Sequence, residues 1–301
     1  MLNSFLDDIV ERQDSTTWLI MADWLEDQND PRAELVRLTW QLIYESCHVD
    51  FSLRQFRLQQ LLRSGVTPVR PKRIINGVEF VWIPNGWFIE GSPATEKGRQ
   101  PTEWQQTFFV PKPFWMSIYP ITQKQFQKVA GYNPSFFARD SPGAEPVSHI
   151  PGSVLEDFPV EWLNHYEAIA FCYKFGHDVT LPTSSLWEYA CRAGTTTPWS
   201  FGTECNREDA LCAPDRHVNE NSLHPAPVNS VCYYPNAWGL YGMHGNVWEW
   251  TSSTLPDANN ALIRGGSFLS TAKSCRSACK VSVNRSYYSK TLGFRIIQPI
   301  V

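Results

Sequence analysis

The chain has 301 residues, a formal net charge of −4 and 43% hydrophobic residues. A negative net charge argues against general affinity for nucleic acid, and no stretch reaches the ~18–20 apolar residues of a membrane span. The N-terminus lacks a basic segment followed by an apolar run, so we expect no secretory signal and a cytoplasmic protein. Thirteen tryptophans and 22 prolines are typical of a loop-rich fold in which indole rings fill space.

Residues 1–63 predict a small all-α domain. Apolar side chains recur at helical spacing over residues 5–10, 18–25 and 35–43. The segment contains eleven acids and six arginines, so its surface is acidic. An acidic helical surface is ordinarily a solvated face, and the alternative is a docking surface for a partner. Residues 64–75 carry prolines and a glycine without periodicity and predict a linker, which places a second domain at 76–301.

The sequence of the second domain predicts strands, helices and much irregular loop. This mixture is typical of an α+β fold. Val78–Phe88 alternates like a strand and hairpin, and Thr107–Tyr119 predicts another strand pair. A helix is expected directly after Thr122, whose hydroxyl is suited to capping it.

Six long motifs follow one another in this domain. They are FVWIPNGWFIEGSP (80–93), YPITQKQFQKVAGYNPSFF (119–137), PVEWLNHYEAIAFCYKFG (159–176), LPTSSLWEYACRAGTTTPWSFG (181–202), GLYGMHGNVWEW (239–250) and the segment 264–295. Together they resemble the formylglycine-generating enzyme and sulfatase-modifying-factor family. The resemblance implies that family's C-type-lectin-like fold, rich in irregular loops. Met21–Leu38 separately resembles a helical module found beside repeat and effector domains in planctomycete-type bacteria.

The resemblance draws attention to a missing thiol. Oxidases of the family hold Cu(I) with two cysteines, one in a GGS-x-x-C motif and one five residues later. Here Ser270 stands at the first position and Cys275 keeps the second. A serine hydroxyl is a hard donor with negligible affinity for Cu(I), so copper binding is not expected. An altered oxidase would have to act with Cys275, Ser267 and Trp248 as its candidate catalytic residues.

Eight cysteines occur in the chain, at positions 47, 172, 191, 205, 212, 232, 275 and 279. No CxxC pair is among them, which argues against a zinc signature. The resemblance implies a disulfide partner for Cys191 just after Arg295, where Ile296 stands, so we expect reduced thiols. On a helix Cys279 would lie about 5–6 Å from Cys275, within reach of one metal ion, whereas on a strand it would lie ~13 Å away. The resemblance implies extended or loop structure here, so Cys279 is not expected to replace the missing ligand.

Glu249 lies between two tryptophans in the GNVWEW motif. A carboxylate inside an aromatic cluster needs either an arginine or a metal ion as partner. The resemblance implies structural calcium held by residues 242, 245, 247 and 249, which here are Gly242, Gly245, Val247 and Glu249. Because Gly242 offers no side-chain oxygen, both alternatives stay open: a calcium site and a Glu249–arginine pair.

Residues 264–295 contain seven Lys or Arg residues and no acid, with serines and tyrosines between them. This composition is typical of adaptable recognition surfaces. We expect ligand-binding residues at Phe268, Ser270, Lys273, Ser274, Lys280, Asn284, Tyr287, Tyr288 and Lys290. Arg276 and Arg295 are expected to be internal and paired with acids such as Glu188 or Glu249.

The preferred interpretation is a non-catalytic formylglycine-generating-enzyme-like domain that binds a protein or peptide, fused to a helical adaptor. An acidic partner would suit the basic segment, and neither nucleic acid nor a membrane is expected. One alternative is a copper-dependent oxidase that converts a peptide cysteine to formylglycine with an altered one-cysteine site. Another is a variable ligand-binding protein of a diversity-generating retroelement or defence cassette. No cofactor other than structural calcium is suggested.

Overall fold

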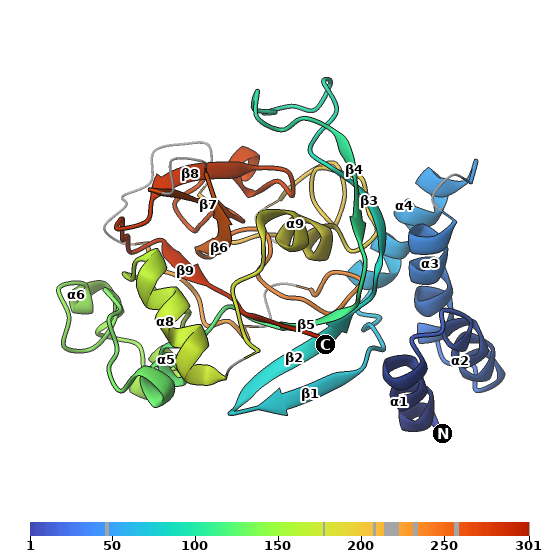
Figure 1. The fold of residues 1–301 in the computed structure, drawn as a ribbon, viewed down its shortest axis with the longest axis horizontal. Coiled ribbons are helices and arrows are strands. Elements are labelled where there is room, and N and C mark those ends of the chain that lie inside the picture. Colours follow the sequence, from blue (N-terminus) through green and yellow to red (C-terminus); the bar gives the residue numbers. More distant parts are fainter. Residues whose placement is uncertain are drawn as a thin grey trace.

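A computed structural model describes residues 1–45, 48–176, 178–206, 209–213, 223–230, 234–255 and 259–300. Within these ranges, two four-stranded sheets and a two-stranded hairpin are combined with helices and long irregular segments (Figure 1). The expected α+β fold is confirmed. No helix in the described part of the chain is both long and apolar enough to cross a membrane.

Four helices form the N-terminal part, on the right of Figure 1: α1 (Leu2–Arg12), α2 (Thr16–Asp27), α3 (Arg32–Tyr44) and α4 (Phe51–Arg63). They pack directly on the first sheet, since the rings of Trp18 and Trp82 lie 6.1 Å apart. The Arg70 guanidinium lies over Trp18, 4.4 Å from the ring centroid. The helices therefore share a hydrophobic core with the sheet. Independent folding of residues 1–63 stays a prediction.

The first sheet has the strand order β1-β2-β5-β10 and is antiparallel. Its strands are β1 (Lys72–Ile75), β2 (Val78–Ile83), β5 (Phe114–Ser117) and β10 (Ile297–Pro299). Residues 72–75 of the expected linker thus form an edge strand. The last strand of the chain lies beside β5, so the start and end of this domain meet in one sheet.

The projecting hairpin consists of β3 (Gly86–Glu90) and β4 (Gln106–Val110). The prediction that residues 78–88 form a strand and hairpin of their own was wrong in its pairing. Strand β2 pairs with β1 and β5, whereas β3 pairs with β4. The difference follows from the long connection between β3 and β4, which local alternation does not reveal. Both strands expected within 107–119 form, as β4 and β5, but they do not pair with each other: β4 pairs with β3, and β5 pairs with β2 and β10.

The second sheet has the order β8-β7-β6-β9. Its strands are β6 (Trp248–Thr254), β7 (Asn260–Arg264), β8 (Lys280–Asn284) and β9 (Leu292–Phe294). Strands β6 and β9 are parallel, which brings the GNVWEW motif beside the GFR motif. This pairing places Glu249 opposite Gly293, two residues before Arg295.

The remaining helices are α5 (Gln123–Ala130), α6 (Ala144–Val147), α7 (Gly152–Leu155), α8 (His165–Phe175) and α9 (Ser184–Arg192). Thr122 caps α5 as expected: its side chain accepts a hydrogen bond from the Gln125 backbone, and the Gln125 side chain accepts one from the Thr122 backbone. Helix α9 contacts β3, β6 and β7 and lies near the centre of Figure 1. Its buried Glu188 pairs with Arg192 and with Arg264 of β7, both at 2.9 Å.

Candidate functional site

Ser270 closes a tight turn that begins at Ser267. Its hydroxyl accepts a hydrogen bond from the Ser267 backbone N–H at 3.0 Å and lies 3.0 Å from the Ser267 hydroxyl. Phe268, in the same turn, is buried against Phe137 with ring centroids 5.8 Å apart. The Ser270 oxygen is therefore used within the turn, where it holds the loop in shape.

Cys275 ends a 3-10 helix, Ala272–Cys275, and is fully buried. Its sulfur lies against Gly266, where a Cβ atom would stand 2.4 Å from Sγ. Gly266 has a φ of 75°, so both the backbone and the space require glycine there. A hydrogen bond with a neighbouring thiol and burial together raise the pKa of Cys275. The Cys275 sulfur is therefore tightly packed and stays protonated.

The segment from Cys275 to Cys279 is a loop, one of the two forms that the resemblance implied, and not an extended strand. After the 3-10 helix the chain turns, and the Cys279 backbone N–H donates to the Arg276 carbonyl at 3.1 Å. Cys279 is fully buried, and burial raises the pKa of its thiol to about 11. Arg276, at the start of this turn, pairs with the acids Glu96 and Glu103.

Two cysteines that the sequence reasoning passed over lie beside Cys275. Hydrogen bonding from the thiols of Cys205 and Cys275 lowers the pKa of Cys212. The segment that carries Cys212 is held on two sides: Ala213 N–H donates to the Ser270 carbonyl at 2.8 Å, and Asn246 N–H donates to the Leu211 carbonyl at 2.9 Å. Only this tertiary contact could reveal the cluster, since no sequence spacing marks it. Cys47 and Cys232 lie outside the described residues.

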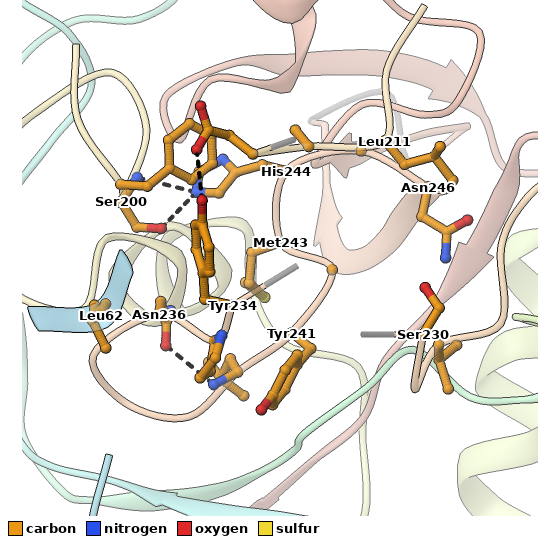
Figure 2. Close-up of a pocket in the computed structure, with 18 of the residues that line it drawn as sticks. Leu62, Ser200, Leu211, Ser230, Tyr234, Asn236, Tyr241, Met243, His244 and Asn246 are labelled. Atoms are coloured by element: carbon orange, nitrogen blue, oxygen red, sulfur yellow. Dashed lines mark hydrogen bonds between the residues drawn. The ribbon is translucent and has the colours of Figure 1, made fainter. Parts of the chain in front are cut away.

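His244 fixes the position of the Cys275 backbone. Its Nδ1 lies 2.8 Å from the Cys275 carbonyl. Its Nε2 accepts the Ser200 backbone N–H at 3.1 Å (Figure 2). These partners assign the proton to Nδ1, which donates to the carbonyl. Burial lowers the pKa of His244 to about 4, so the ring is neutral near pH 7. We infer that His244 holds the cysteine segment in place.

A small cavity opens on the other side of His244 (Figure 2). Its walls include Leu62 of α4, Tyr234, Asn236 and Met243. The cavity volume is about 40 Å³. A buried water needs roughly 10–15 Å³, so the cavity has room for a few waters.

The Glu249 carboxylate is fully engaged by protein donors. Oε2 accepts Nε of Arg295 at 2.7 Å and the Trp187 indole N–H at 2.6 Å, and Oε1 accepts Nη2 of Arg295 at 2.9 Å. Of the two alternatives for this carboxylate, the arginine pair is the one observed. Gly242 adds no side-chain oxygen, so these residues do not fit calcium, which takes about six to eight oxygen ligands. Within the described ranges, no group of three or more His, Cys, Asp or Glu side chains is arranged to hold a metal ion.

A family model described as the Sulfatase-modifying factor enzyme 1-like domain matches residues 66–300. The chain belongs to this family. It is 29% identical to inactive C-alpha-formylglycine-generating enzyme 2 of Mus musculus, over 72% of this chain and 84% of that protein. It is 34% identical to the formylglycine-generating enzyme of Mycobacterium tuberculosis, over 39% of this chain and 38% of that protein.

Solved structures share the fold at low sequence identity. PvdO from Pseudomonas aeruginosa superposes with a TM-score of 0.63 and 23% identity, covering 78% of this chain and 99% of that one. Treponema denticola variable protein 1 superposes with a TM-score of 0.58 and 22% identity, covering 78% of this chain and 100% of that one. The formylglycine-generating-enzyme-like fold expected from the motifs is thereby confirmed.

Three of the seven basic residues in 264–295 of this family member are internal. Arg264, Arg276 and Arg295 are fully buried, so they offer no charge to a partner. Arg295 pairs with Glu249 as expected, whereas Arg276 pairs with Glu103 at 2.8 Å and also with Glu96. Glu188, one of the acids expected as a partner, pairs instead with Arg192 and Arg264.

The other expected ligand-binding residues differ in exposure. Lys273 and Asn284 are exposed, Ser274 and Lys280 are partly buried, and Tyr287 and Tyr288 are about half exposed. Two of them have aromatic neighbours: the Tyr288 ring lies 5.1 Å from that of Trp162, and the Lys290 ammonium lies 5.8 Å from the Phe136 centroid. Phe268 is only 2% exposed and belongs to the core. Trp248 is partly buried against the core cluster, and Gly245 and Val247 are buried.

Proposed function

We propose that this chain is a non-catalytic member of the family that binds a protein or peptide. The observation that carries the proposal is the state of the two thiol positions. Ser270 offers a hydroxyl that is bonded within its own turn, and Cys275 is fully buried with a raised pKa. A Cu(I) site open to a substrate thiol needs accessible thiolates instead. The similarity to relatives named as inactive formylglycine-generating enzyme 2 supports the same conclusion.

The binding surface that we propose is the exposed part of the C-terminal segment. Tyr287 and Tyr288 expose about half of their area, at 50% and 52%, and Lys273 is also exposed. Tyrosines give large contact area at small entropic cost, and lysines at the rim favour an acidic partner. An acidic protein or peptide in a reducing, cytoplasmic setting is therefore the partner that we propose.

The first test asks whether the protein has oxidase activity. The purified, reduced protein is incubated with Cu(I), oxygen and a Cys-x-Pro-x-Arg peptide, and the peptide mass is measured. We expect an unmodified peptide and no copper retained after gel filtration. Aldehyde formation would overturn the proposal in favour of the oxidase alternative.

Binding is tested separately with the intact chain. Binding of a glutamate-rich peptide is measured by fluorescence anisotropy for the wild type and for Tyr287→Ala with Tyr288→Ala. Loss of binding in this variant, with an unchanged melting curve, supports the proposed surface. Equal binding by both proteins contradicts it. The exposed Tyr173, on helix α8, provides a matched tyrosine control.

A further inference from the structure

Cys205, Cys212 and Cys275 form a cluster of thiols that the proposed binding role leaves unused. Hydrogen bonding from both of the others lowers the pKa of Cys212. Cys205 and Cys212 are partly exposed, whereas Cys275 is fully buried. The two partly exposed cysteines pack at the edge of the small apolar cluster of Trp199 and Phe201. Two partly exposed thiols beside the same small apolar cluster can approach each other to form a disulfide.

The three thiols of the cluster differ in how well their anions are stabilised. Cys212 is placed to accept S–H hydrogen bonds from two neighbouring thiols, so its anion is stabilised relative to theirs. Oxidants attack the thiolate form of an accessible cysteine. Cys212 is therefore the member that an oxidant reaches first.

Cys205 is the better partner for the second step. The Cys275 sulfur is wedged at Gly266, where a Cβ atom would be 2.4 Å away, and its backbone carbonyl is held by His244. Moving that sulfur would disturb a buried segment. Cys205 has no such constraint, since its thiol is partly exposed and makes only a weak 4.0 Å contact to the Asn206 carbonyl besides its interaction with Cys212.

A soft metal ion is the competing occupant of three thiols. Within the part of the chain that the structure describes, these three thiols are not arranged as a set that could hold a metal ion. Two neighbouring thiols, one of them favoured as the anion, are sufficient for oxidation. The geometry therefore favours redox chemistry at this cluster.

We propose that Cys205 and Cys212 are a peroxide-responsive pair that closes to a disulfide. The Cys212 sulfur attacks the O–O bond of a hydroperoxide, an S–O bond forms, and the alcohol leaves after taking up a proton. The Cys205 sulfur then attacks the sulfenic sulfur, an S–S bond forms, and the hydroxyl leaves with the Cys205 proton as water. The two thiols supply two electrons, and the hydroperoxide is reduced to an alcohol and water.

The pair is placed to influence the surface beside it. Ala213, next to Cys212, donates its backbone N–H to Ser270, so closing the disulfide fixes the chain at the edge of the Ser267–Ser270 turn. Through this backbone hydrogen bond, we expect oxidation to be felt at the turn while the buried Cys275 stays reduced.

The experiment uses the full chain. Reduced, chelator-treated wild type is titrated with hydrogen peroxide, remaining thiols are alkylated under denaturing conditions, and the peptides are mapped by mass. We expect a Cys205–Cys212 disulfide. In Cys205→Ser, a sulfenic-acid trap should label Cys212 about tenfold more than any other cysteine. Cys212→Ser should lose both products, and the matched control Cys279→Ser should behave like wild type.

Several results would overturn the inference, and none of them depends on a variant alone. The first is that Cys205 and Cys212 of the wild type both remain alkylatable at peroxide concentrations that oxidise free cysteine. The second is a disulfide that joins Cys212 to Cys275 instead of Cys205. A metal that co-purifies with the protein and protects the thiols until a chelator removes it would assign the cluster to metal binding.

Discussion

Removing the Arg295 guanidinium should unfold this protein more readily than any surface substitution. Arg295 is fully buried, and its nitrogens bond both oxygens of Glu249. Further bonds reach the carbonyls of Ser117, Ile118 and Tyr241, at 3.2, 3.2 and 2.8 Å. The substitution Arg295→Met keeps much of the side-chain volume but leaves a buried carboxylate and three carbonyls without these donors.

The expected loss is the penalty for an unpaired buried charge, about 3–5 kcal/mol. Replacing both partners, Arg295→Met with Glu249→Gln, should recover part of that loss because no charge is left unpaired. Equilibrium urea unfolding followed by tryptophan fluorescence measures the three proteins. Arg37→Met is the matched control, since Arg37 makes an exposed pair with Asp23 at 3.0 Å and should hardly change the midpoint.

Two results would refute this reasoning. The first is an Arg295→Met protein with the stability of the control. The second is a large stabilisation of the wild type by millimolar calcium, because Glu249 would then act as a metal ligand and its bonds to Arg295 would not represent the bound state.

Three further predictions concern the cysteine segment and its supports. Ser270→Cys should retain Cu(I) after gel filtration where Ser270→Ala and wild type retain little, and equal retention by all three would contradict the loss of the site. The folded pKa of His244, about 4, lies below its unfolded value of about 6.5, so its contribution to stability is present above pH 6.5 and is lost as pH falls towards 4. Wild type should therefore lose about 2 kcal/mol more than His244→Gln between pH 7 and pH 5 in urea unfolding, and parallel pH profiles would contradict the lowered pKa. Arg276→Met should expose the segment 96–103 to limited proteolysis, because its ion pairs with Glu103 and Glu96 hold that segment down; an unchanged digestion pattern would contradict this anchoring role.

Much of the fold could be predicted from the sequence alone. The order of the motifs identified the family, and Thr122 marked the start of its helix through a reciprocal cap with Gln125. The sequence also narrowed the partner of Glu249 to an arginine or a metal. These inferences succeeded because capping and alternation depend on residues a few positions apart, and because a charged side chain in an apolar motif demands a partner.

The thiol cluster and the ion pairs were decided by tertiary structure. Cys212 meets Cys275 only because the segment 211–213 is held between Asn246 and Ser270 by backbone hydrogen bonds. Arg276 likewise pairs with Glu103 because the long loop between β3 and β4 packs against the 3-10 helix. Such contacts depend on the path of irregular loops, for which the sequence has no periodic signal. The sequence by itself determined the family and the lost first cysteine; the packing of distant segments determined which side chains now surround the second.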